Sequence, residues 1–330
     1  MKRTILMSIA AAAVVCLFSS CSEKEGVYNP KKQISKIYES STSIYSFLSD
    51  GDWINDTNVQ PKTLAEEWTW DGKKLTKIAF YETGNVNWKS SPYEVVNFTY
   101  DGSQLTRAES DDEYMVLTYD GKKLKQAKIF EKNDNGDVLI MSYDFEHDGK
   151  KVSKIIFSTD LADIDDMDDS RMQRLLFRGL MPTFEQADRT LNLIAKATSR
   201  FDGAKASVSL PFTLTWSGNN ISSMSTSYPG TGMSATVNYS YDNKNNPYQN
   251  FLFGLIGFIE QPTFPMFNEN NITKTVMTAS MPILDGSETE EVSYSYTYDG
   301  DWPLSQTFTE TDEDEDYRHE ATTTRYFEYK

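Results

Sequence analysis

The chain has 330 residues, and its 49 Asp and Glu residues outnumber its 32 Lys and Arg residues, which gives a formal net charge of −17. This excess of negative charge disfavours nucleic acid and an anionic membrane surface as partners. The sequence contains no Walker loop and no G-x-G-x-x-G before a helix, so it gives no support for nucleotide binding, and we expect no cofactor.

Residues 1–20 are predicted to be a lipoprotein signal peptide. Lys2 and Arg3 precede an apolar run that is shorter than a bilayer span. Cys21 follows small residues and resembles the lipid-bearing cysteine of a bacterial lipobox. This resemblance implies a lipid at Cys21 that anchors the chain to a membrane without a spanning helix. The alternative is an ordinary signal peptide whose cleavage site abuts a cysteine.

Cleavage would remove two positive charges and change the formal charge from −17 to −19. Residues 21–30 would then carry the lipid and form a short tether. Residues 31–330 would form a single domain, which contains no cysteine and must be stabilised by burial alone.

The stretch WTWDGKKLTKI at 68–78 recurs as FTYDGSQLTRA at 98–108, as LTYDGKKLKQA at 117–127 and, more loosely, as FEHDGKKVSKI at 145–155. Asp-Gly pairs favour tight hairpin turns because these turns need positive φ. Aromatic residues alternate with Thr or Ser before each turn, and an aliphatic residue follows it. The repeat therefore predicts antiparallel hairpins with aromatic side chains on one face of the sheet.

The pattern locates eight second strands, which begin near Ile34, Leu75, Leu105, Leu124, Val152, Ile221, Ile272 and Leu304. We therefore predict an all-β fold, an antiparallel meander of about sixteen strands that closes or curls into a barrel to hide its edges. In the segment LTKI, Leu75 and Ile78 are three residues apart. A β-bulge just after the turn would place both on one face.

Two short helical insertions are predicted, near 160–200 and near 245–265. The second contains NFLFGLIGFIE, which is apolar nearly all round and too short to span a bilayer, so we expect a buried plug or lid. Charged residues on the strands argue against a membrane-spanning barrel, whose outer face must be apolar; they include Lys77, Glu94, Arg107, Glu113 and Lys128.

The aromatic-Asp-Gly unit is similar to the YD repeats of Rhs-type proteins, which roll a long β-sheet into a hollow shell. The lipobox with CSEKE, the TWDGKKLTKI hairpins, YDNKNNPYQNFLFGL and NENNITK resemble a group of uncharacterised Bacteroidetes lipoproteins with a porin-like β-barrel fold. This resemblance covers most of residues 21–330. It implies a barrel at the outer membrane, on the surface or the periplasmic face, and it provides no catalytic residue to carry over to this chain. The acidic residues after Cys21 resemble the surface-export signal of the same phylum, interrupted by Lys24.

Few residues could carry catalysis. His147 occupies the slot before the turn where other repeats place Trp or Tyr, and His319 lies among charged residues, where we expect it to be solvated. With no cysteine in the folded part, Cys–His catalysis and Cys-ligated zinc are excluded.

Two acidic runs suggest calcium as a possible ligand. The first comprises Asp163, Asp165, Asp166, Asp168 and Asp169, and the second spans residues 312–316. The first run lacks the Gly and Glu of an EF-hand loop, and we interpret both runs as solvated loops. No metal is expected.

Aromatic residues make up 13% of the chain. Trp68, Trp70 and Trp216 occupy the slots before the turns, and we expect them in the core. Trp53, Trp88 and Trp302 lie outside these slots and are our candidates for stacking on the flat apolar face of a sugar ring.

We therefore predict a lipid-anchored, non-enzymatic protein of the cell envelope that binds a ligand, with carbohydrate as the leading class. The first alternative is a structural or interaction protein that contacts other envelope proteins. The second alternative is a glycoside hydrolase that uses a pair of carboxylates, which need only a set separation across a cleft.

Overall fold

The computed structural model describes residues 24–49, 52–83, 91–160, 207–227, 234–253, 265–281, 286–314 and 317–330. Within these residues the chain forms sixteen β-strands and short 3-10 segments, at 252–253 and in η3 (Pro265–Phe267). The strands are β1 (Ile34–Ser49), β2 (Asp52–Asp71), β3 (Lys74–Phe80), β4 (Glu94–Asp101), β5 (Gln104–Glu109), β6 (Glu113–Asp120), β7 (Lys123–Glu131), β8 (Val138–Asp148), β9 (Lys151–Asp160), β10 (Ser207–Ser217), β11 (Asn220–Ser227), β12 (Ser234–Asn245), β13 (Asn270–Met281), β14 (Gly286–Asp299), β15 (Trp302–Asp314) and β16 (Tyr317–Tyr329).

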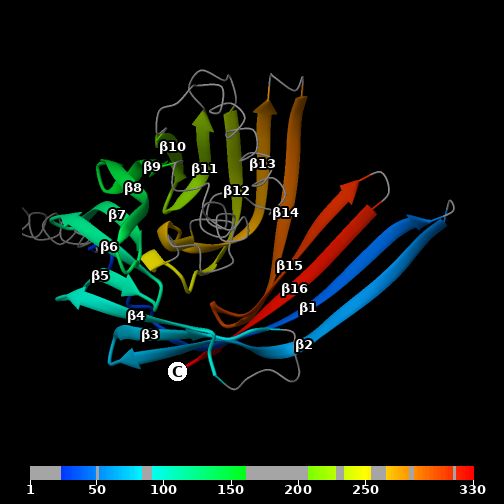
Figure 1. Ribbon diagram of the computed structural model, residues 1–330, viewed down its shortest axis with the longest axis horizontal. Coiled ribbons are helices and arrows are strands. Elements are labelled where there is room, and N and C mark those ends of the chain that lie inside the picture. Colours follow the sequence, from blue (N-terminus) through cyan, green and yellow to red (C-terminus); the bar gives the residue numbers. More distant parts are fainter. Residues whose placement is uncertain are drawn as a thin grey trace, which may run out of the picture.

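Each strand pairs antiparallel with its neighbours in sequence, and β16 pairs with β1, so the sheet closes into a barrel (Figure 1). The predicted meander of about sixteen strands is confirmed, and of the two predicted outcomes, closed or curled, the barrel is closed. All eight predicted second strands start within two residues of the positions that the repeat indicated.

One end of the barrel carries the tight turns, and we call it the turn rim. It consists of residues 24–33, 71–74, 101–104, 120–123, 148–151, 217–220, 242–246, 268–270, 299–302 and 328–330. Six of these hairpins have two-residue loops that begin with a Gly whose φ lies between 58° and 62°. Positive φ at the first loop residue is typical of a type II′ turn, which matches the twist of the flanking strands.

The predicted bulge after the turn is present. Trp70 pairs with Leu75, but Thr69 pairs with Lys77, so Thr76 is the extra residue of a β-bulge. The hydroxyl of Thr76 donates to the carbonyl oxygen of Thr69 at 3.0 Å. As a result, Leu75 and Ile78 are both fully buried in the barrel. The same register shift follows the turns of β4–β5, β6–β7, β8–β9, β10–β11 and β14–β15.

Aromatic side chains near the turns join neighbouring hairpins through what we call the aromatic clasp. Tyr100 in β4 donates its hydroxyl to the carbonyl oxygen of Leu75 at the start of β3, at 2.7 Å. Equivalent bonds run from an aromatic residue of one hairpin to the preceding hairpin around the rim: Trp70 to Ile34, Tyr119 to Leu105, Trp216 to Val152, Tyr241 to Ile221, Tyr296 to Ile272 and Tyr329 to Pro303. The repeated aromatic therefore supplies both core volume and a link between hairpins.

The barrel interior is an apolar core. Trp68 and Trp70 are buried in it, and Trp216 packs against it half-buried, so the prediction for these three residues is confirmed. Phe251 and Phe253, from the connection between β12 and β13, insert among the same rings. The described part of the predicted plug is therefore inside the barrel.

The helical prediction for this insertion is not supported by the described residues. Between 245 and 253 the chain forms turns and ends in a 3-10 segment at 252–253, without an α-helix, and the described residues from 265 onward begin with the three-residue η3. Residues 254–264 and the whole predicted insertion near 160–200, apart from Asp160 at the end of β9, lie outside the described residues.

The segment after Cys21 contacts the barrel from its first described residues. Tyr28 is buried among Trp68, Trp70 and Phe251, and its hydroxyl donates to the carbonyl oxygen of Pro247 at 2.7 Å. Residues 24–30 therefore help to fill the turn rim instead of hanging free. In the described residues, no helix has the length and apolar character to cross a membrane.

Candidate functional site

A cavity beside the plug is lined by Tyr248, Tyr294, Tyr296 and Gln306, among others, but its volume is only about 20 Å³. That volume suits one or two water molecules and not a sugar ring. This cavity is therefore not a carbohydrate site.

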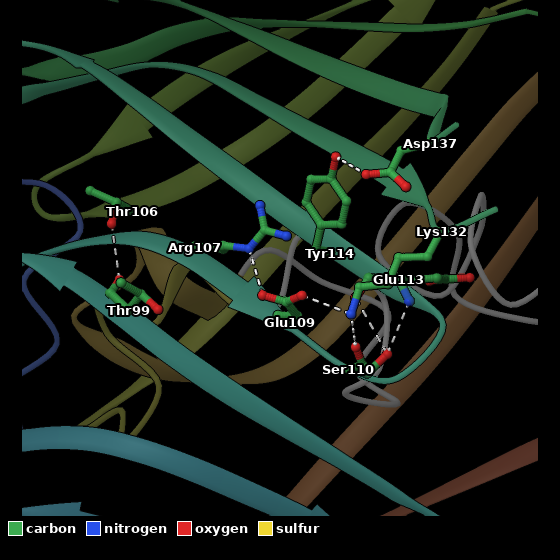
Figure 2. Close-up of polar contacts among 9 residues, drawn as sticks. All are labelled: Thr99, Thr106, Arg107, Glu109, Ser110, Glu113, Tyr114, Lys132 and Asp137. Carbon is green, nitrogen blue, oxygen red and sulfur yellow. Dashed lines mark hydrogen bonds and ion pairs between the residues drawn. The ribbon is translucent and has the colours of Figure 1, made fainter. Parts of the chain in front are cut away.

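Carboxylates gather at the end opposite the turn rim, between β4 and β7 (Figure 2). Glu109 accepts from Arg107 Nε and forms an ion pair with Lys132 Nζ, each at 2.7 Å. These two hydrogen bonds lower the pKa of the Glu109 carboxyl to about 2. The Arg107 guanidinium also lies over the ring of Tyr114, whose hydroxyl donates to Asp137 at 2.8 Å. Glu109 is thus a fixed anion within an ion-pair network.

Glu94, at the start of β4, has a carboxyl whose pKa is shifted in the opposite direction. The pKa of its carboxyl is raised to about 7, mainly by burial. A hydrogen bond with Ser110 lowers this pKa in part, and the nearby negative charges of Glu113, Asp112 and Asp111 raise it. Two carboxyls whose pKa values are pushed apart are what an acid and base pair requires. However, Glu109 is held by two cations, so the cluster does not favour the hydrolase alternative. In the described residues, no group of acidic or His side chains is arranged to hold a metal ion.

An exposed surface with aromatic residues lies far from the turn rim, where β1, β2 and β16 extend together. We call residues 42–49, 52–61 and 317–322 the finger (Figure 1). Every residue of β2 from Asp52 to Val59 is exposed, so both faces of this strand meet solvent. Asn, Asp, Gln, Ser and Thr dominate the finger, and aromatic residues are placed among them.

One face of the finger presents Trp53. Its neighbour across the strand pair is Leu48, and the guanidinium carbon of Arg318 lies 4.4 Å from the indole ring centroid. This cation–π contact fixes the orientation of the indole, which remains 37% exposed. Of the predicted sugar-stacking residues, Trp53 therefore lies on an exposed surface.

The other face of the finger is also partly aromatic. Phe47 pairs with Ile54 on one side and with Tyr317 on the other, and the rings of Phe47 and Tyr317 have centroids 5.4 Å apart. Further along, the ring of His319 stacks on Tyr45 at 4.4 Å between centroids. The expectation that His319 is simply solvated is wrong, because this stacking leaves it half-buried.

The predicted tryptophans do not form one site. Trp302 is half-buried on the turn rim, where its ring meets Tyr329 edge-on at 6.0 Å. Arg318, beside Trp53, is eleven residues from Tyr329 along β16, which corresponds to roughly 36 Å of strand. Trp88 lies outside the described residues.

The same is true of other predicted positions. Cys21 and the calcium candidates Asp163, Asp165, Asp166, Asp168 and Asp169 lie outside the described residues. The second acidic run begins within β15, and its last two residues, 315–316, are outside as well.

Sequence reasoning missed the partners of Trp53. Arg318 is 265 positions away in the sequence and reaches Trp53 only because β16 closes the barrel against β1. The signal available in the sequence was the polar stretch DWINDTNVQ, which reads as an exposed strand with amide and carboxylate side chains around one indole.

No protein-family model matches this chain, and no curated protein matches its sequence. Similar solved structures include a porin-like protein from Bacteroides uniformis ATCC 8492, with a TM-score of 0.47 and 12% identity, covering 93% of this chain and 100% of the other. A porin-like protein from Bacteroides vulgatus ATCC 8482 has a TM-score of 0.43 and 8% identity, covering 91% and 99%. The structure of TcdB2-TccC3-Cdc42 has a TM-score of 0.26 and 13% identity, covering 88% of this chain and 16% of that chain. This chain is similar to porin-like proteins of Bacteroides, the resemblance that its hairpin sequences predict.

Proposed function

We propose that this protein is a non-enzymatic binding protein of the cell envelope and that the finger binds carbohydrate. The observation that carries the proposal is Trp53, an indole that is 37% exposed on a rigid sheet and fixed by Arg318 at 4.4 Å. The exposed part of such a ring can stack on the apolar face of a pyranose. An aromatic side chain held in place loses little conformational entropy when it stacks on a ligand.

Polar side chains on the same face supply hydrogen bonds. Asn55 and Thr57 follow Trp53 at steps of two residues along β2, so they point to the same side of the sheet. Arg318 adds further donors beside the ring. An aromatic platform edged by amide, hydroxyl and guanidinium groups suits a ligand with many hydroxyl groups.

The test is a glycan array probed with the chain from residue 22, which contains the whole closed barrel. We expect one class of oligosaccharide to bind, and the variant Trp53→Ala to lose about tenfold in affinity for it, the effect of one stacked ring. Trp302→Ala is the matched control because Trp302 lies on the opposite end of the barrel, and it should bind as the parent chain does. Equal losses in both variants would reject the finger as the site.

The anchor is a separate part of the proposal. Cys21 would carry the lipid and hold the barrel at the outer membrane, on its surface or its periplasmic face. Cells fed an alkyne-labelled fatty acid should incorporate the label into the parent chain and not into Cys21→Ser. Protease added to intact cells would then distinguish the two faces, because only a surface-displayed chain would be cleaved.

A protein partner is the second candidate, favoured by the apolar side chains of the finger. Ile54 is 57% exposed and Phe47 is 47% exposed, and they are neighbours on the face opposite Trp53. Exposed apolar residues that lie together on one strand pair are typical of interaction surfaces. Cross-linking on whole cells from a reactive group at Ile54 would capture such a partner, and the same group at Thr118, on the barrel wall, is the control.

A further inference from the structure

The turn rim has a charge that differs from that of the rest of the protein. Three of its turns carry paired lysines, Lys73–Lys74, Lys122–Lys123 and Lys150–Lys151, and five of these six side chains are exposed. Adding Lys24, Lys31, Lys32, Lys244 and Lys330, the rim holds eleven lysines against ten Asp and Glu residues. The remainder of the sequence holds 39 acidic and 21 basic residues. The rim thus has a formal charge of +1, whereas the rest of the sequence has a formal charge of −18.

Contacts between turns hold these lysines at one end of the barrel. Lys32 forms an ion pair with Asp299 at 2.8 Å, which joins the start of β1 to the β14–β15 turn. Gln33 donates to the carbonyl oxygen of Gly72 at 2.9 Å, and Lys151 donates to that of Gly218. The turns are thus held side by side with their lysines pointing away from the core.

The chain also enters the barrel at this rim. The amide of Glu25 donates to the carbonyl oxygen of Lys122, and the amide of Leu105 donates to that of Gly26, each at 2.9 Å. Cys21 is three residues before Lys24, a length of chain that can reach at most about 11 Å. A membrane anchor at Cys21 would therefore bring the lysine turns within reach of lipid headgroups.

We propose that the turn rim rests on an anionic, phosphate-bearing lipid surface and that the finger points away from it. Each lysine near such a surface strengthens binding by about fivefold at moderate ionic strength. This placement revises the expectation from net charge alone, because 39 of the 49 acidic residues are outside the residue ranges of the rim. The orientation depends on the anchor of the proposed function, whereas the contact between lysines and phosphates does not.

The test uses the chain from residue 22, which has no lipid, in co-sedimentation with vesicles. Phosphatidylcholine vesicles and vesicles with about 30 mol% phosphatidylglycerol are compared at low and high salt, since salt screens surface charge. We expect binding to the anionic vesicles only, and loss of this binding at high salt. The variant Lys73→Ser, Lys123→Ser, Lys150→Ser should bind about a hundredfold more weakly.

The control variant carries Lys62→Ser, Lys128→Ser and Lys274→Ser, which change the same number of charges away from the rim. Both variants should unfold at the denaturant concentration of the parent chain, so that lost binding is not lost folding. The proposal is overturned if the parent binds neutral and anionic vesicles alike, or if the control weakens binding as much as the rim variant. These outcomes leave the glycan test of Trp53 unaffected.

Discussion

His147 Nε2 lies 3.0 Å from one carboxylate oxygen of Glu25 and 3.1 Å from the other. His147 pairs with Val152 as Tyr119 pairs with Leu124, so it occupies the clasp position of its hairpin, as the repeat predicts. A clasp aromatic here would meet the carbonyl of Leu124. Instead, Glu25 accepts the amide of Leu124 while it contacts His147. At this hairpin, Glu25 of the N-terminal segment thus takes the place of the clasp bond.

Removal of the Glu25 carboxylate should loosen this segment. We expect Glu25→Ala to lower the free energy of unfolding by about 1–3 kcal/mol, because the mostly buried His147 ring and the Leu124 amide lose their partner. Urea unfolding measures the change. Glu328→Ala, an exposed carboxylate on the same rim, is the control. If both variants unfold at the same urea concentration, Glu25 does not stabilise the rim.

Each clasp should contribute separately to stability. Tyr100→Phe and Tyr119→Phe remove only a hydroxyl, and each should cost about 0.5–1.5 kcal/mol because a carbonyl oxygen loses its donor. Tyr326→Phe is the matched control, since its hydroxyl lies 3.4 Å from Ser40 on the outer wall. Thermal unfolding of the three variants compares them directly, and equal melting temperatures would argue against the clasps.

Two glycines with positive φ should respond differently to alanine. Gly26 has a φ of 76° and Gly72 a φ of 58°, so both variants incur backbone strain of about 1–2 kcal/mol. A Cβ at Gly72 would meet no atom within 4 Å, whereas at Gly26 it would overlap the hydroxyl and ring of Tyr119. We therefore expect Gly26→Ala to cost about 1–3 kcal/mol more than Gly72→Ala. Urea unfolding would contradict this if the two variants matched.

Glu94 should make stability depend on pH. Its pKa is raised from 4.5 to about 7, so the folded chain binds this proton more tightly than the unfolded chain. The free energy of unfolding should therefore fall as the pH rises through this range, by about 1 kcal/mol after solvent screening of a partly exposed group. The Glu94→Gln variant should lose this slope, and Glu82→Gln, at an exposed position, should keep it. If the free energy of unfolding of Glu94→Gln still falls over this pH range, a group other than Glu94 causes the pH dependence.

Much of the fold could be predicted from the hairpin repeat, because its period, turn residues and bulge are all local properties. The three-residue step from Leu75 to Ile78 is reconciled by a bulge that local sequence already indicates. The clasps could not be predicted in the same way. The bond from Trp70 to Ile34 depends on which hairpin lies beside which, and that follows only from closure of the barrel.

The candidate site was predicted in part. Trp53 stood out because it breaks the rule that aromatic residues precede the turns, and it is exposed. Its contact with Arg318 and its distance from Trp302 both depend on the pairing of β1 with β16. The set of lysines on the turn rim could not be predicted either. Paired lysines that are far apart in the sequence reach the same end of the barrel only when every second turn lies at that end.

The measurement that tests the account most directly is calorimetric titration of the best array glycan into three chains. These are the parent from residue 22, Trp53→Ala and Trp302→Ala. The account predicts saturable binding to the parent and to Trp302→Ala, with affinity about tenfold lower for Trp53→Ala. Binding that is unchanged in Trp53→Ala would show that the finger is not the carbohydrate site.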